Sequence, residues 1–574
     1  MRRPRLLSGA VVVGAWLAGW PAAAPAAEPT MPLDQVRSGM RCTALSVVRG
    51  TTISSFDVEV LDVVRGEEGA RDPRILIRVS GPAVDQTGLG PGFSGSPVLC
   101  PDAAGTVRNA GAISETVGEF GGKLGLVTPI EQVLGEPVDV PASAPAAPRG
   151  ARPLAGPLTI SGLSEPVAGA LRAAARRARR QITTAPAASR ALIAPTVLTP
   201  GASMAAGVSS GDVTTGAIGT VTYVDGDRVW GFGHELDAVG RRSLLLQDAY
   251  VYTVVNNPAG TQEASTYKLA AAVNDLGTMS NDAPDAIAGR LGVLPRRFAL
   301  RIVTQDLDTG RTDVSASTVA DERDLGFPGG LSGLATVGPV ALAQAAFEAL
   351  RGSPVDQSGE MCLRVTVRER RKPLRFCNRY IGGGGPSSAG APMVADMVEA
   401  VALLESFRLG RLTITAVDAH VRLRRALRQA YLRRVEGPRV VRRGTTVTVR
   451  AVARVVRGGV VRRAVKVRIP RALGAGEQEL VLTGRPADQA GGLEDLTQVL
   501  ELSLGGEGEG DDDRDDPGPR SVAALAEKIA GLHRYDGVTA SWRRPGGRRH
   551  LVRRALRDPE LRLSGAARLR VWVR

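Results

Sequence analysis

The hexapeptide Gly92-Phe93-Ser94-Gly95-Ser96-Pro97 is the stretch on which our interpretation of the whole chain depends. A serine between two glycines, closed by a proline, predicts a tight and exposed turn, because glycine adopts backbone conformations that a Cβ would forbid. Such a turn can present the Ser94 hydroxyl and aim neighbouring backbone N–H groups at one point. Acyl transfer requires this combination of a nucleophile and an oxyanion hole. A plain Gly/Ser loop is the alternative interpretation.

The sequence around this turn is patterned as short β-strands. Residues 58–64 and 75–79 are partly alternating and partly apolar throughout, and glycine and proline separate such runs. Val98 and Leu99 begin another strand directly after the turn, and the apolar segment 111–113 follows it. We therefore expect an all-β unit over residues 28–140, with the serine turn near its end.

A second β unit carries a histidine at the end of a hairpin. Residues 217–224 predict a strand, Asp225-Gly226-Asp227 predicts a turn, and residues 228–234 return as a strand that ends at His234. The other three histidines are His420, His533 and His550. Taken alone, such a histidine is more often a core or surface residue than a catalytic one.

The serine and histidine segments together resemble the SpoIVB (stage IV sporulation protein B) family of serine peptidases. That family has a G-x-S-G-S-P turn followed by a strand and a G-A-[VI] segment, and a G-x-G-H segment after a hairpin. Residues 277–282 and 286–292 are also similar to it. The resemblance covers about residues 32–136 and 211–310. It implies a chymotrypsin-like double β-barrel in which Ser94 is the nucleophile and His234 the general base.

This chain also departs from the family's pattern. The sporulation peptidase has its histidine segment before its serine turn, whereas here the serine unit comes first. A catalytic triad is defined by geometry and roles, so this order does not forbid catalysis. The family's acidic residue, which lies shortly before the serine, has no counterpart in the matching Ser80-Gly81-Pro82. We also find no PDZ module.

Several carboxylates could orient the imidazole of His234. Asp282 ranks first, because its distance along the sequence from His234 is close to that between the histidine and aspartate of chymotrypsin-type triads. Asp248 follows an apolar strand, Asp85 precedes the serine, and Glu235 adjoins the histidine but should point away from it on a strand. A Ser–His dyad oriented by a backbone carbonyl is a further alternative. The backbone N–H groups of Gly92 and Ser94 are the expected oxyanion donors.

Composition limits the classes of partner. The 574-residue chain is 43% hydrophobic and 23% charged, which is ordinary for a globular protein, and it is long enough for several domains. Its net charge of +15 comes almost entirely from arginine. The basic residues are spread along strands rather than interleaved with aromatic residues, so we expect no nucleic-acid partner. An arginine-rich proteome, or peripheral association with an anionic cell envelope, explains the charge as well. We expect no cofactor.

The N-terminus predicts export. Residues 1–27 combine a basic start, a short apolar stretch and small residues suited to cleavage, as in a signal peptide. After residue 27, we expect no segment long and apolar enough to span a membrane. An even number of cysteines in an exported chain suggests disulfides. Spacing alone allows three pairings; we expect Cys42–Cys100 and Cys362–Cys377, because each pair falls within one proposed unit. The four cysteines form no C-x-x-C pair, so we expect no metal site.

These patterns predict a mainly β protein: a chymotrypsin-like double β-barrel core, then a mixed α/β region and a β-sandwich module. The expected units are a signal peptide (1–27), a serine-bearing barrel half (28–140), a linker (141–160), a histidine-bearing barrel half (161–310), a mixed α/β region (311–435), a β-sandwich-like module (436–486), an acidic disordered loop (487–519) and a basic C-terminal piece (520–574).

The function that we expect is that of an exported serine endopeptidase acting on a protein or peptide, which could include its own chain. The alternative is a catalytically inactive binding or scaffold protein of the cell envelope built on a peptidase fold. The missing family acid and the sandwich module favour the alternative.

Overall fold

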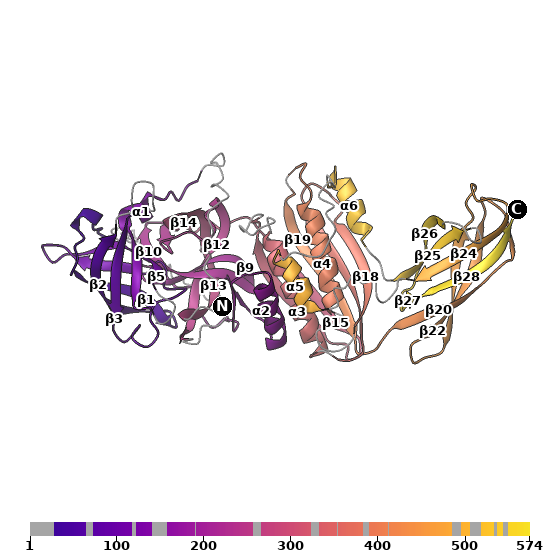
Figure 1. Ribbon diagram of the computed structural model, residues 1–574, viewed down its shortest axis with the longest axis horizontal. Helices are drawn as coiled ribbons and strands as arrows, with labels where there is room; N and C mark the ends of the chain where they lie inside the picture. The colour runs from indigo at the N-terminus through magenta and orange to yellow at the C-terminus, as the bar shows by residue number, and fades with distance from the viewer. Residues whose placement is uncertain are drawn as a thin grey trace, which may run out of the picture.

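The computed structural model of the chain is mainly β, with 52% of the residues in strands and 16% in helices, as expected. Figure 1 shows an elongated molecule with β-barrels at one end and a β-sandwich at the other. The expected signal peptide and most of the expected linker lie outside the described residues. The structure describes residues 28–64, 73–117, 122–140, 158–189, 191–256, 266–322, 332–352, 354–382, 390–410, 412–484, 495–505, 518–532, 536–543 and 549–574.

The first β unit is a closed six-stranded barrel in the order β1-β2-β3-β6-β5-β4. Alternation decides which side chains point inward: Phe56, Val58 and Val60 are buried, whereas Asp57 and Glu59 between them are exposed. The serine turn lies between the third and fourth strands. The strands are β1 (Arg41–Arg49), β2 (Thr52–Val64), β3 (Arg74–Ser80), β4 (Pro97–Pro101), β5 (Val107–Val117) and β6 (Leu124–Pro129), with the short helices η1 (Leu33–Gln35) before them and α1 (Ile130–Gly135) after them.

Six strands of the second β unit also close into a ring, because β9 pairs with both β10 and β12. The remaining pairings are β10–β11, β11–β14, β14–β13 and β13–β12. Counted along the chain, both rings therefore have the strand order 1-2-3-6-5-4. His234 lies between the third and fourth strands of its ring, as Ser94 does in the first. The strands are β9 (Ser203–Gly211), β10 (Thr214–Asp225), β11 (Arg228–Gly231), β12 (Gly240–Asn256), β13 (Thr266–Ala283) and β14 (Ala286–Leu291).

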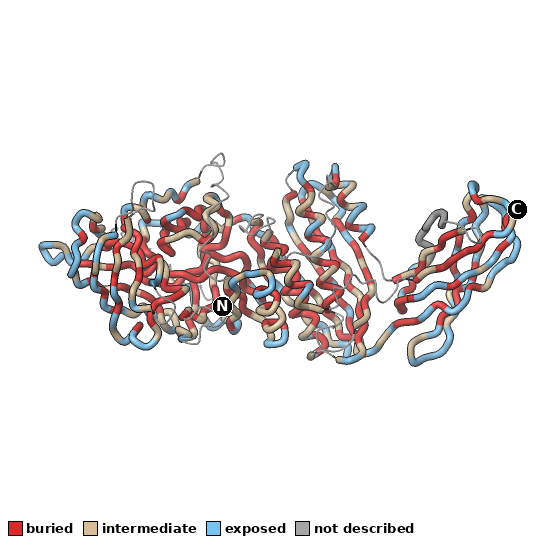
Figure 2. The backbone as a smooth tube through the Cα atoms, viewed as in Figure 1, coloured by how far each residue is buried: buried red, intermediate tan, exposed pale blue. Residues whose placement is uncertain are grey.

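The second ring is part of a larger sheet of 13 strands. On one side β10 pairs with β7, and on the other β9 pairs with β16, which leads through β15, β19 and β17 to β18. Buried residues (red in Figure 2) run through the barrels and this sheet, and exposed residues gather at hairpin tips. The added elements are β7 (Leu158–Ser161), α2 (Glu165–Arg177), β8 (Ile182–Ala185), β15 (Arg297–Asp306), β16 (Thr312–Ala320), α3 (Gly333–Leu350), β17 (Gln357–Val367), β18 (Leu374–Gly382), α4 (Gly390–Glu405) and β19 (Ile414–Arg424).

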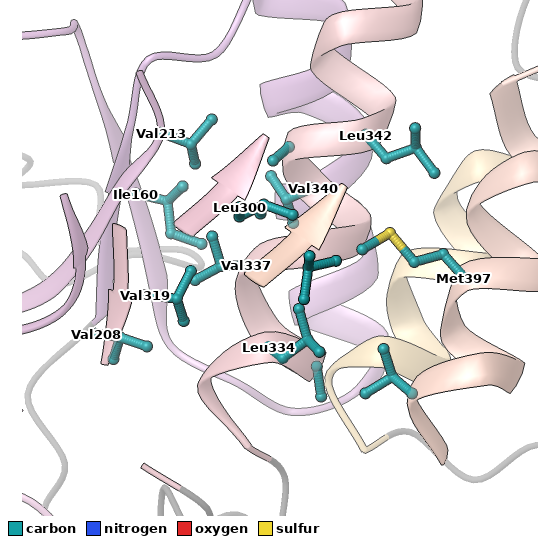
Figure 3. Close-up of a cluster of buried hydrophobic side chains, with 14 of the residues drawn as sticks. Ile160, Val208, Val213, Leu300, Val319, Leu334, Val337, Val340, Leu342 and Met397 are labelled. Atoms are coloured by element: carbon teal, nitrogen blue, oxygen red, sulfur yellow. The ribbon is translucent and has the colours of Figure 1, made fainter. Parts of the chain in front are cut away.

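The helices α3 and α4 pack together on the extended part of this sheet. Figure 3 shows Val337 and Val340 of α3 in a cluster of buried side chains with Leu300 of β15 and Met397 of α4. Contrary to the sequence-based expectation, α3 is long and apolar enough to cross a membrane. However, 89% of its residues are buried inside the structure, as is usual for a core helix.

The C-terminal sandwich consists of a four-stranded sheet, β23-β22-β20-β27, and a five-stranded sheet, β21-β28-β24-β25-β26. The prediction of a separate basic piece at 520–574 was wrong, because β25 to β28 complete both sheets. The pairings of β25, β27 and β28 with earlier strands join residues 54 to 133 positions apart along the chain, so local patterning could not show them. The strands are β20 (Gln429–Glu436), β21 (Val440–Val441), β22 (Thr446–Val455), β23 (Val460–Arg468), β24 (Gly476–Gly484), β25 (Gly537–Arg543), β26 (Arg549–Arg557), β27 (Arg562–Ser564) and β28 (Ala566–Val573).

The prediction of an acidic disordered loop over 487–519 was wrong in its middle part. Helix α5 (Leu496–Ser503) forms there, with the Asp495 side chain accepting a hydrogen bond from the N–H of Thr497. The helix buries Val499 and Leu500 and packs against α2 and α4. A second helix, α6 (Val522–Ala530), packs near β18. The acidic run at 506–517 lies outside the described residues.

Both expected disulfides are present, Cys42–Cys100 and Cys362–Cys377. The first joins β1 to β4, the strand that follows the serine turn. The second joins the adjacent strands β17 and β18. Both therefore lie within single units, as the sequence suggested.

Removing the first disulfide should destabilise the protein more than removing the second, because it closes the longer loop. We expect Cys42→Ala/Cys100→Ala to lower the free energy of unfolding by about 4 kcal/mol and Cys362→Ala/Cys377→Ala by about 3 kcal/mol, from the loop-closure model. Urea denaturation measures both, and non-reducing peptide mapping checks the pairing. A Cys42–Cys362 peptide would contradict the structure.

Candidate functional site

The serine turn is fixed against β10 of the second ring. The carbonyl of Ser94 accepts a hydrogen bond from Thr220 N at 2.8 Å, and the carbonyl of Gly95 accepts one from Thr222 Oγ1 at 2.9 Å. Gly95 has φ +93°, and a Cβ there would collide with the backbone at Thr220 and Phe232. Only glycine therefore allows this close approach of the two rings.

The geometry of the turn leaves two backbone N–H groups available to an anion. Gly92 and Ser94 donate to no acceptor within the described part of the chain, whereas Phe93, Gly95 and Ser96 donate to carbonyls nearby. Gly92 has φ +96°, which positions its peptide for the turn. The Ser94 residue is half-buried, so the site is shielded but reachable. Two such donors beside a hydroxyl have the arrangement of an oxyanion hole.

The segment that carries His234 is held by the first barrel. Thr128 Oγ1, at the end of β6, donates to the carbonyl of Gly233 at 2.7 Å. The Nδ1 atom of His234 lies 2.5 Å from the carbonyl oxygen of Glu235. The Ser94 hydroxyl and the His234 ring make no hydrogen bond with each other in the residues that the structure describes. The structure therefore brings their two segments together without joining the side chains.

Asp282, the first-ranked triad acid, serves the loop after His234. Its carboxylate is fully buried and accepts hydrogen bonds from Leu236 N at 2.7 Å and Asp237 N at 3.0 Å. It also forms an ion pair with Arg242 at 3.2 Å. None of its hydrogen bonds goes to the imidazole. Within the described chain, the group found at Nδ1 is a backbone carbonyl, which corresponds to the dyad alternative.

The other candidate acids have different roles. Asp248 is buried and accepts hydrogen bonds from the N–H groups of Thr196 and Asn274, both at 2.7 Å. Asp85 is exposed and forms an ion pair with Lys123 at 2.8 Å. Hydrogen bonding from Lys123 lowers the pKa of Asp85 below its ordinary value. Both acids therefore stabilise local structure.

Sequence reasoning missed Lys268, which lies beneath the serine turn. Its Nζ donates to Ser46 Oγ at 2.7 Å and to Thr220 Oγ1 at 3.2 Å, and it lies 4.8 Å from the centre of the Phe93 ring. Burial lowers the pKa of Lys268 to about 7. A lysine within the otherwise apolar segment 267–273, in a chain with few lysines, was the signal that could have found it.

Among the described residues, no cluster of three or more histidine, cysteine, aspartate or glutamate side chains could hold a metal ion.

Comparison with known proteins finds no family model, curated protein or solved structure that matches this chain.

Loss of the Asp282 charge should destabilise the histidine loop. In Asp282→Asn, the buried Arg242 loses an ionic partner. One of the two backbone N–H groups that donate to the carboxylate would instead face the NH2 group of the new side chain, which is also a donor. We therefore expect the free energy of unfolding to fall by about 3 kcal/mol. The matched control is Asp85→Asn, which breaks an exposed, solvent-screened pair and should leave the free energy of unfolding nearly unchanged. Equal urea midpoints for the two variants would contradict the role of Asp282.

The buried amine should make stability depend on pH. A lysine titrates near pH 10.4 when unfolded and near pH 7 here, so between these values the unfolded state binds more protons and stability rises with pH. Below pH 7 the amine is protonated in both the folded and the unfolded state, so the full free-energy cost of burying its charge is present. Across this window we expect a gain on the order of 5 kcal/mol.

Urea denaturation at pH 6, 8 and 10 tests this expectation. The gain in stability with pH should disappear in Lys268→Met. It should persist in Lys123→Met, because Lys123 is exposed and paired in the wild type. The same pH dependence in the wild type and Lys268→Met would show that another group is responsible.

Proposed function

We propose that this protein is an exported serine endopeptidase of the SpoIVB type, with Ser94 as the nucleophile and His234 as the general base. The observation that carries the proposal is the repeated architecture: two six-stranded rings share one strand order, and each places one of these residues between its third and fourth strands. The segments that carry the residues then meet where the rings touch.

The double ring supports a chymotrypsin-like fold. Peptidases of that type place their catalytic groups across the cleft between two barrels. Ser94 has no histidine in its own barrel, and a serine hydroxyl at its ordinary pKa is a weak nucleophile. The base must therefore come from the second ring, whose only histidine is His234.

In the proposed reaction, the Ser94 hydroxyl attacks the carbonyl carbon of the peptide bond while His234 Nε2 takes its proton. The negative charge that develops on the carbonyl oxygen is stabilised by the N–H groups of Gly92 and Ser94. The histidine then gives the proton to the amine of the cleaved bond, and the amine departs. The remaining acyl-enzyme is hydrolysed by water. The carbonyl of Glu235 orients the ring by accepting from Nδ1–H. Asp282 contributes by holding the loop next to the histidine.

Catalysis requires the hydroxyl of Ser94 and Nε2 of His234 to come within about 3 Å of each other. Such catalytic hydrogen bonds are often long before substrate binds and tighten in the complex. A peptide substrate bound between the barrels would bring the two segments into this arrangement. The substrate could be another exported protein or a segment of this chain.

A scaffold or binding protein of the cell envelope is the second candidate. The absence of a Ser94–His234 hydrogen bond in the described residues, and the use of Asp282 by the loop backbone, favour it. In that case the barrels retain the peptidase architecture without its chemistry.

A fluorophosphonate probe, which reacts with activated serines, distinguishes the two candidates. The wild type should be labelled at Ser94, whereas Ser94→Ala and His234→Ala should each lose at least about 10³-fold in labelling or peptide hydrolysis. The losses should not add in the double variant, because the two residues act as one unit. Ser114→Ala, a serine in the same barrel bonded to Leu126 O, is the control. Full labelling of His234→Ala would exclude the mechanism.

A further inference from the structure

Lys268 reaches across from the second ring and lies against the inner side of the serine turn. Its backbone N–H donates to the carbonyl of Pro91 at 3.0 Å. Its side-chain carbons lie so close to Gly92 that a Cβ there would collide with them. The amine at its end is fully buried and faces the ring of Phe93. This one residue therefore contacts three successive residues of the turn.

These contacts fix the peptide group between Pro91 and Gly92. Its carbonyl is held on the inner side by the backbone N–H of Lys268. A trans peptide places its C=O and its N–H on opposite sides. The N–H of Gly92 must therefore point away from Lys268, toward the side on which an anion could bind.

The peptide group between Phe93 and Ser94 is fixed in the same way, through hydroxyl groups. The carbonyl of Phe93 accepts a hydrogen bond from Ser96 Oγ at 2.6 Å. Ser96 Oγ lies 3.0 Å from Ser46 Oγ, which in turn accepts from Lys268 Nζ at 2.7 Å. All of these groups are buried. The N–H of Ser94 is consequently directed outward as well.

A second branch of this network reaches Gly92. Lys268 Nζ donates to Thr220 Oγ1 at 3.2 Å, and the Thr220 hydroxyl donates to the carbonyl of Gly92 at 2.9 Å. An amine has no acceptor role when protonated, so it sets the direction of donation along both branches. Each branch ends on a carbonyl of the turn.

We propose that Lys268 is a positioning residue, which holds the Pro91–Gly92 and Phe93–Ser94 peptide groups so that their N–H groups form the anion-binding pair of the site. This inference rests on the proposed function for its catalytic consequence, because the anion is then the oxyanion of the reaction. The orientation of the two peptide groups is a structural claim that stands separately.

The charge of Lys268 adds a pH dependence. Among the described residues, the side chains in contact with the amine are Ser46 from β1, Phe93 from the serine turn and Thr220 from β10, none of which ionises near neutral pH. Burial lowers the pKa of Lys268 to about 7. Within the same part of the chain, no ion pair with a carboxylate compensates the ammonium. Negative charge arriving at the turn supplies that compensation and favours the protonated amine.

The test compares the wild type with Lys268→Met, which keeps the backbone N–H and an apolar side chain of similar length. We expect fluorophosphonate labelling of Ser94, and kcat on a peptide substrate, to fall about 10²-fold with KM nearly unchanged, because the interaction is made in the transition state. The ratio of wild-type to variant rates should decrease as the pH rises through about 7, where the amine loses its proton. A variant with wild-type rates, or a ratio independent of pH, would overturn the catalytic part of the inference.

Further variants separate this role from general loss of stability. Ser96→Ala keeps Lys268 but removes the hydroxyl on the Phe93 carbonyl, and should slow labelling about 10-fold. Lys123→Met and Ser114→Ala remove an exposed lysine and another barrel serine, and both should label at the wild-type rate. If labelling of these controls slowed as much as labelling of Lys268→Met and Ser96→Ala, a specific role for Lys268 would be contradicted.

Crystal structures of the wild type and Lys268→Met decide the structural claim even if neither protein labels. Without labelling, the proposed function fails, but a rotated Phe93–Ser94 peptide in the variant would still support the positioning role of the side chain. The Pro91–Gly92 peptide should stay in place, because the variant keeps the backbone N–H that binds the Pro91 carbonyl. An unchanged Phe93–Ser94 orientation would overturn the inference whatever the labelling shows.

Discussion

The hydrogen bonds between the serine turn and strand β10 are the interaction on which the candidate site depends. Thr220 N and the side chains of Thr220 and Thr222 bind three carbonyls of the turn, those of Ser94, Gly92 and Gly95. Each such bond contributes only about 1 kcal/mol net, but a buried carbonyl left without a partner costs more. These bonds therefore add to those that hold the turn within its own barrel, such as the one from Gly95 N to the carbonyl of Ile113, and the surface that joins the rings also shapes the site.

The repeated strand order explains why two segments about 140 positions apart in the chain can meet. Each ring places its third-to-fourth connection toward the other ring, and the two connections carry Ser94 and His234. The contacts are reciprocal, because β10 holds the serine turn while Thr128 of the first barrel holds Gly233 beside the histidine. Asp282 then fixes the loop that follows the histidine. Each ring thus positions the functional segment of the other.

Burial of the Lys268 amine is the feature of this junction that lowers the stability of the fold. Burying an amine without a carboxylate partner disfavours its charged form, and an apolar side chain would pack there without that penalty. Its hydrogen bonds run through Ser46, Ser96 and Thr220 to the carbonyls of the turn. This arrangement opposes stability and favours negative charge at the turn, as expected where a protein binds or stabilises an anion.

The sequence by itself determined the mainly β character of both units, the hairpin before His234 and the turn at Gly92–Pro97. Those features follow from local alternation and glycine positions. The sequence left three cysteine pairings open, and the structure has the pairing expected from the division into units. Only the tertiary structure decided that β25 to β28 complete the sandwich, that Asp282 binds a loop rather than the imidazole, and that Lys268 lies beneath Phe93. The physical reason is that strand pairing and side-chain hydrogen bonds join residues far apart in the chain, and their partners are set by packing rather than by local pattern.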